Sequence, residues 1–251
     1  MTEHDARSAP PDRTAAHDAQ HQPMFNAPAV VVGLLGLLIA IHAVFAVLEW
    51  LGQEPRVTWW GWALAFVPAR YYGTVQGIPG GNLSAVTSFV THTLLHHDIA
   101  HLLINGAWLL AFGAMVARRV GALRFLALYL GSAIAGALLY IVINGNSDAV
   151  MLGASGAISG LFGGAFRFFF RSLELRRDGY SAEETAFVPR MTLTEMATEP
   201  RVRSAMIAWV VINFVVAVAT PIVGGSIAWE AHLGGFLFGL LTFALFDPVK
   251  A

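Results

Sequence analysis

The 251-residue chain contains no cysteine, and only 12% of its residues are charged. The absence of cysteine excludes disulfides, thiolate metal sites and a cysteine nucleophile. The scarcity of charge, together with 56% hydrophobic residues, excludes a soluble globule with a hydrated surface and favours a protein embedded in a lipid bilayer. The net charge of −1 gives no sign of a nucleic-acid partner.

The first 26 residues also lack the basic start and short apolar core of a signal peptide. They are polar and mixed in charge, so residues 1–26 are predicted to form a disordered cytoplasmic tail. Residues 27–247 are predicted to form one transmembrane domain, which enters the membrane by its first span.

Six later stretches are apolar and long enough for a bilayer-crossing helix, which needs roughly 20 residues. They are Ala27–Leu51, His92–Ala117, Ala122–Ile143, Val150–Phe170, Ser204–Val223 and Ala228–Phe246. The predicted fold is an all-α membrane protein with a bundle of six transmembrane helices. Residues 52–90 are rich in tryptophan and tyrosine and broken by proline and glycine, which predicts an insertion lying at the membrane interface.

Basic residues indicate the orientation of the six spans. Apart from Arg56 and Arg70, all of them fall on the side of the termini. Because positive charge is enriched on the cytoplasmic side, both termini and the polar loop 171–203 are predicted to be cytoplasmic. We expect a multi-pass protein of the bacterial plasma membrane.

The fourth stretch is unusual because it is short between its flanking charges, Asp148 and Arg167, and rich in glycine. A complete transmembrane helix hardly fits. We predict a loop that dips into the membrane and turns into a helix near Ser155, which is tolerated only where the loop is buried in protein or beside water.

Ser155 is the candidate nucleophile. It lies in the sequence Gly153-Ala154-Ser155-Gly156, where small neighbours allow a substrate backbone to approach and the free N–H groups of a helix start can stabilise an oxyanion. The pattern alone is weak evidence, because a turn used only for packing looks the same.

His232 is the candidate base, since a serine hydroxyl needs a base to accept its proton. Counted back from the charges that follow each helix, Ser155 and His232 both lie roughly 18 to 22 Å from the cytoplasmic end. Stripes of small residues predict close contact of the two helices. The stripes are Gly156, Gly160 and Gly164 on one helix and Ala231, Gly235 and Gly239 on the other.

His101 and Asn105 lie one helical turn apart in the second span and reach the same depth. Neutral donors there could complete an oxyanion hole. The alternative is that these side chains only hold helices together, as we expect for Asn213. His97 and His101 also have the spacing of two zinc ligands on a helix, but a third ligand and the usual glutamate base are missing. Nothing in the spacing of Glu230 makes it a triad acid.

These motifs resemble those of the rhomboid family of intramembrane serine proteases. The resemblance covers Ala27 to Phe246. It consists of His101-x-x-x-Asn105 in the second span, Gly153-Ala154-Ser155-Gly156 opening the fourth, and Ala231-His232-x-x-Gly235 in the sixth.

The resemblance implies a Ser155–His232 dyad without an acid, and an oxyanion held by His101, Asn105 and the Ser155 N–H. Gly153, Gly156 and Gly235 would support the site, and no metal or cofactor is expected. The implied partners are transmembrane protein substrates in the lipid bilayer, which enter beside the fifth span and the cap from Pro221 to Ser226. The sequence does not predict the oligomeric state.

Two positions depart from the family's pattern. Ser159 stands where an aromatic residue usually packs on the catalytic histidine, and Ala117 stands where glutamate is common. The first puts the positioning of the imidazole in doubt, and the second is expected to lower local stability. A scaffold that binds membrane segments without cutting them is the main alternative, and a small transporter is disfavoured because the polar residues gather in the outer half.

Overall fold

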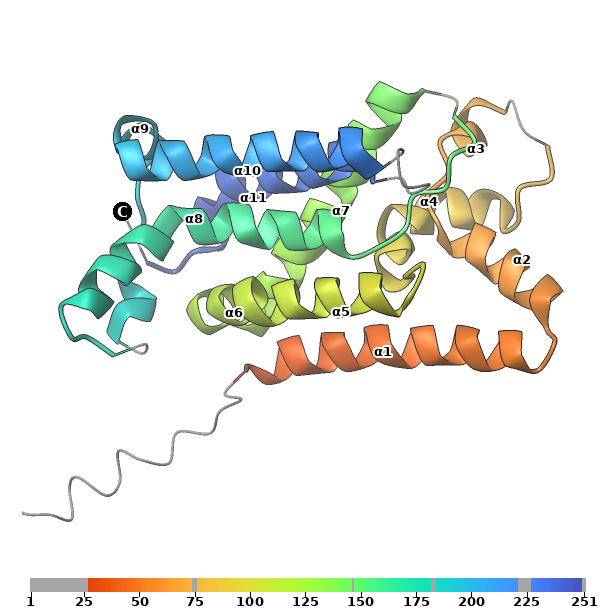
Figure 1. Ribbon diagram of the computed structural model, residues 1–251, viewed down its shortest axis with the longest axis horizontal. Helices are drawn as coiled ribbons and strands as arrows, with labels where there is room; N and C mark the ends of the chain where they lie inside the picture. The colour runs from red at the N-terminus through yellow and green to blue at the C-terminus, as the bar shows by residue number, and fades with distance from the viewer. Residues whose placement is uncertain (1–26, 74–75, 146, 182–183, 221–226, 250–251) are drawn as a thin grey trace, which may run out of the picture.

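The computed structural model describes residues 27–73, 76–145, 147–181, 184–220 and 227–249 (Figure 1). These residues form helices and no β-strand, apart from a single bridge between Phe66 and Met151. The all-α class is therefore confirmed for this part of the chain. The predicted tail 1–26 and the cap from Pro221 to Ser226 lie outside the described residues.

Within the residues that the structure describes, five helices are long and apolar enough to cross a membrane, judged by length and composition. They are α1 (Ala29–Trp50), the composite helix Ile99–Val120, α7 (Ala122–Asn144), α10 (Pro200–Ala219) and α11 (Trp229–Phe246). The long helix α8 (Ser155–Arg177) is rich in glycine and arginine and does not meet that criterion, so the six-span count stays a prediction. It lies in the middle of the bundle, packed against α7 and α11 (Figure 1).

The second span starts later than the predicted His92, because Asp98 caps it. The Asp98 backbone is extended, and its carboxylate accepts the N–H of His101 at 2.7 Å, so the helix begins at Ile99. The span consists of α5 (Ile99–Trp108), a π-helical stretch (Leu109–Gly113) and α6 (Ala114–Val120). The preceding His92–Leu94 segment is a separate 3-10 turn.

The insertion predicted as an interfacial loop is itself helical. It contains α2 (Glu54–Leu64), α3 (Ala69–Tyr72) and α4 (Gly81–Thr91), which are grouped over the C-terminal half of α1, at the right of Figure 1. Gly80 precedes α4 with a φ of 91°, and a side chain there would overlap Ser84. Two backbone hydrogen bonds between Phe66 and Met151, of 3.0 and 2.9 Å, join the insertion to the segment before α8.

The opposite end of the bundle is held by polar contacts. The helix α8 continues beyond the predicted Phe170, and the loop that follows contains a 3-10 turn (Glu184–Phe187) and α9 (Leu193–Thr198). The buried guanidinium of Arg119 donates to both carboxylate oxygens of Asp247 at 2.9 Å and to the Val188 carbonyl at 2.8 Å. These bonds join α6, the polar loop and the end of α11.

The closest helix packing is found where α8 meets α11. A Cβ added to Gly235 would overlap the Gly156 carbonyl oxygen, and one added to Gly239 would overlap that of Gly160. The two backbones are thus in direct contact, as close helix packing by small residues requires. The peripheral helix α10, by contrast, buries only Val202.

Candidate active site

Ser155 is the first residue of α8, and the chain that leads to it is held in place by Gly153. Gly153 has a φ of 119°, and its N–H donates to the His92 carbonyl at 2.9 Å. A Cβ on Gly153 would lie only 2.7 Å from the His101 ring. Both the conformation and the space therefore require glycine, and they set the half-buried Ser155 hydroxyl at the start of a helix.

His232 lies in the first turn of α11 and points at Ser155. Its Nε2 is 2.7 Å from Ser155 Oγ, which is a hydrogen-bond distance. The contact follows from the packing of the two helices, because Gly156 abuts the backbone of Ala231 one residue before the histidine. The two side chains that the sequence analysis assigned to the same depth thus meet directly.

Asn213 of α10 contacts the other side of the same imidazole. Its Oδ1 lies 2.8 Å from His232 Nδ1, and its Nδ2 donates to the Trp229 carbonyl at 3.2 Å. From the sequence, Asn213 is expected to pair with a neighbouring helix, but nothing in the sequence connects it with the site. The available signal was its isolation, since it is the one amide in a long apolar run.

His101 and Asn105 approach Ser155 from α5. The His101 ring lies against Gly153, and a Cβ on that glycine would also be 3.8 Å from Ser155 Oγ. The buried Asn105 donates one amide hydrogen to the His101 carbonyl at 3.0 Å. Because an amide carries two hydrogens, one donor of Asn105 remains for another acceptor.

A family model described as the rhomboid domain matches residues 83–248. The chain belongs to the rhomboid family. This confirms the resemblance drawn from the sequence motifs. Together with its apolar helices, membership makes the chain an integral membrane protein.

Curated rhomboids are also similar to this chain. The rhomboid protease GlpG of Haemophilus influenzae is 25% identical over 63% of this chain and 68% of its own length. Rhomboid protein 1 of Saccharomyces cerevisiae mitochondria is 30% identical over 61% of this chain and 40% of its own length. YdcA of Bacillus subtilis is 43% identical over 30% of this chain and 37% of its own length. The last two alignments span less than half of those rhomboids.

The two positions that depart from the rhomboid pattern, Ser159 and Ala117, lie in α8 and α6. Ser159 is half-buried on α8, and among the described residues no aromatic ring stacks on the His232 imidazole. Ala117 is buried in α6, where the nearby Arg119 guanidinium lies 4.5 Å from the centre of the Phe168 ring. At this end of α6, Arg119 and its contacts with Phe168, Val188 and Asp247 hold the neighbouring segments together.

Other polar residues near the site have separate partners. Glu230 is buried, and its Oε1 accepts a bond of 3.0 Å from Asn144 Nδ2, so α7 and not His232 is its partner. His97 is exposed beside the capping Asp98. Within the described ranges, no three histidine, aspartate or glutamate side chains lie together as metal ligands would.

Two histidines of the segment before α5 are buried. His92 Nδ1 lies 2.8 Å from the Ser88 carbonyl oxygen, and burial lowers the pKa of His92 to about 4. His96 lines a cavity of about 120 Å³ together with His42, and its ring centre is 5.1 Å from that of His101. Burial also lowers the pKa of His96 to about 4, so both rings are neutral at neutral pH.

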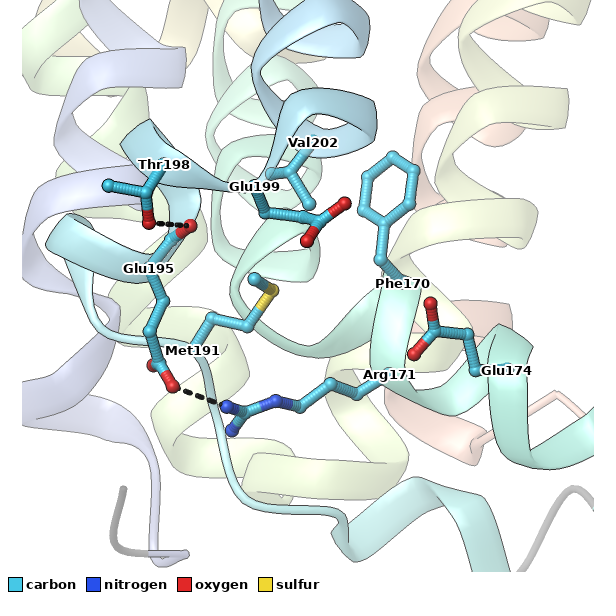
Figure 2. A pocket seen from close by; sticks show the side chains of 8 residues that line it. All are labelled: Phe170, Arg171, Glu174, Met191, Glu195, Thr198, Glu199 and Val202. Carbon is cyan, nitrogen blue, oxygen red and sulfur yellow. Dashed lines mark hydrogen bonds and ion pairs between the residues drawn. The ribbon is translucent and has the colours of Figure 1, made fainter.

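A larger cavity, about 280 Å³, lies far from the dyad, at the polar end of α8. Figure 2 shows it between α8, α9 and the start of α10, with Arg171 reaching Glu195 at 2.6 Å. Glu195 also closes a capping box with Thr192, and these bonds to the Thr192 backbone and hydroxyl lower its pKa. The acidic side chains here thus serve the local structure.

Proposed function

We propose that this rhomboid is an intramembrane serine endopeptidase that cleaves transmembrane segments of other membrane proteins with a Ser155–His232 dyad. The observation that carries the proposal is the 2.7 Å distance between Ser155 Oγ and His232 Nε2. A hydroxyl bonded to an imidazole at a helix start is what an acyl-transfer nucleophile needs. The relatives named as proteases support the same reaction.

In the proposed reaction, His232 takes the Ser155 proton while Oγ attacks the scissile carbonyl. The resulting imidazolium protonates the leaving amine, and the C–N bond breaks to leave an acyl-enzyme. A water molecule then gives its proton to His232 and attacks the ester, which releases the acid product and restores the serine. No redox step is needed, and we expect no metal or cofactor.

The developing oxyanion would be held by the Ser155 N–H, His101 and Asn105. Ser155 is the first residue of α8, where N–H groups have no acceptor within the helix, and Asn105 keeps one amide hydrogen beyond its bond to His101. Gly153, Gly156 and Gly235 would allow the close backbone contacts that hold these donors and the dyad in their relative positions. Loss of one such donor typically lowers kcat by about 10²- to 10³-fold.

The proposed substrate is a transmembrane segment that unwinds near its outer end. Helical peptide bonds are shielded by their own hydrogen bonds, so a segment with weak helix propensity exposes a carbonyl to Ser155 most readily. In this proposal residues 27–247 form the rhomboid-like domain, with 52–90 at the interface, a membrane-dipping loop before α8, and 171–203 and both termini in the cytoplasm. A bacterial plasma membrane fits this arrangement.

The test is cleavage of a panel of transmembrane substrates by the detergent-purified protein. Ser155→Ala and His232→Ala are each expected to abolish cleavage, whereas Ser159→Ala, one turn along the same helix, is the matched control and should retain it. A fluorophosphonate should label Ser155 only when His232 is present. Cleavage that survives in Ser155→Ala would refute the mechanism, and folded wild-type protein that is neither active nor labelled would favour the non-catalytic scaffold.

A further inference from the structure

The inference concerns Asn213, and it rests on the proposed function. Between Ala205 and Ala219, Asn213 is the single residue with a side-chain amide, hydroxyl or charge. It is half-buried on a helix whose neighbouring large side chains, such as Ile212 and Phe214, are exposed. Burying a polar group in an apolar span costs free energy unless the group finds a hydrogen-bond partner, and Asn213 finds one in His232.

Two consecutive hydrogen bonds connect Asn213 of α10 to Ser155, and a third joins Asn213 to the start of α11. Asn213 Nδ2 donates to the Trp229 carbonyl at 3.2 Å, and Asn213 Oδ1 lies 2.8 Å from His232 Nδ1. His232 Nε2 then lies 2.7 Å from Ser155 Oγ. Both ring nitrogens of the imidazole are therefore occupied, one by an amide and one by the nucleophile.

The Trp229 carbonyl determines which way the amide points. A carbonyl oxygen only accepts, so it requires the NH₂ group of Asn213, and this leaves Oδ1 facing the histidine. Because Oδ1 also only accepts, His232 must carry its proton on Nδ1. In the neutral ring Nε2 then has a free lone pair, which is the form that can accept the Ser155 proton.

From these hydrogen bonds we infer that Asn213 is a positioning residue, which holds His232 in the Nδ1–H tautomer and orients Nε2 toward Ser155. When His232 becomes imidazolium, the same Oδ1 still accepts from Nδ1 and places a fixed negative dipole beside the new charge. A neutral amide does so without burying a carboxylate among apolar spans. The dyad thus has a third, uncharged member supplied by α10.

Kinetic analysis with three variants separates positioning from simple helix packing. Asn213→Leu keeps the size and removes the acceptor, and it is expected to lower kcat on the order of 10- to 100-fold with less than about a 2-fold change in KM. Asn213→Asp keeps an acceptor for Nδ1 and is expected to retain most of the wild-type kcat. The matched control is the exposed neighbour Ile212→Ala, which should leave both constants unchanged.

Nitrogen NMR of histidine-labelled protein gives a second readout that needs no activity. The His232 signals, identified by their loss in His232→Gln, should show the Nδ1–H tautomer in the wild type and a shift toward Nε2–H in Asn213→Leu. A wild-type His232 found as Nε2–H would overturn the inference even if Asn213→Leu failed to fold. Unchanged kcat and tautomer in folded Asn213→Leu would also overturn it, whereas a wild type that neither cleaves nor labels at Ser155 would refute the proposed function instead.

Discussion

The helices α11 and α10 both contact the candidate site, but they are held in the fold in different ways. The contact of α11 with α8 is backbone to backbone, and their glycines leave no room for even a methyl group. The outer part of α10 presents exposed apolar side chains and reaches the site through Asn213. In its N-terminal half α10 is better anchored, with Trp209 stacked on Phe236 at 4.2 Å.

This difference divides the site into a fixed and an adjustable part. Ser155 and His232 are placed by backbones that interlock over several turns, so their distance is a property of the core. The orientation of the imidazole depends on one side chain from a helix with little packing around it. Substitutions in the interlocked part should therefore change stability, and those on the outer face of α10 should hardly do so.

The largest loss of stability is expected from Asp247→Ala, which removes the carboxylate that accepts from both Arg119 and Arg190 at the end of α11. Removal of one member of a buried ion pair, such as that of Asp247 with the fully buried Arg119, costs about 3 to 5 kcal/mol. The free energy of unfolding can be measured by SDS titration in mixed micelles. Glu174→Ala is the control, because its pair with Arg201 is exposed and should contribute less than about 1 kcal/mol.

Acidification is expected to lower the free energy of unfolding by up to about 3 kcal/mol, because the buried His92 resists protonation in the folded protein. This histidine supports the segment before Ser155. The pKa of His92 is about 4 in the folded protein and 6.5 ordinarily, so the unfolded chain takes up the proton first. Stability should fall as the pH drops from 6.5 toward about 4 and level off below that range. Hydrogen exchange of residues 84–98 against pH measures it, and His92→Asn should reduce the slope to the part contributed by His96, whose pKa is also lowered to about 4. An unchanged slope in that variant would assign the effect elsewhere.

A smaller loss, about 1 to 3 kcal/mol, is expected for Gly239→Ala, because the added methyl group would overlap the Gly160 carbonyl oxygen. Separation of the helices should also lower the fluorophosphonate labelling rate of Ser155. Gly36→Ala on α1 has open space around the new methyl group and should be neutral or slightly stabilising. Equal effects of the two substitutions would contradict the contrast between core and periphery.

The smallest effect is expected for Val210→Ala and Ile212→Ala on the exposed face of α10, where unfolding free energies should stay within about 0.5 kcal/mol of the wild type. The same SDS titration measures them. A loss above about 1 kcal/mol would mean that this face packs against something other than lipid, such as a second copy of the chain.

Much of the fold was predictable because apolar length is a local property. Predicted and observed helices agree within a few residues for α1, α7 and α11. The start of the second span was wrong because Asp98 caps the helix there; the polar run His96-His97-Asp98 directly before Ile99 was the available sequence signal. The helices of the insertion were missed because aromatic residues and helix breakers dominate its composition.

For the candidate site, the sequence could place residues at one depth but could not orient helices about their axes. Depth was enough to nominate Ser155, His232, His101 and Asn105, whose catalytic roles remain proposals. The contact of Asn213 depends on the rotation of α10 relative to α11, which no local pattern encodes. A lone amide in an apolar span points to some partner but does not identify it.

The glycine contacts between α8 and α11 also have a consequence for lipid composition. A helix pair joined by its backbones tilts as one unit when the bilayer thins or thickens, because its members cannot slide past each other without overlap. Mismatch with lipid length is then relieved by helices with freer surfaces, such as α1 and α10. We therefore expect the acyl-chain length of the surrounding lipids to affect the orientation of the imidazole through α10 and to leave the distance between nucleophile and base unchanged.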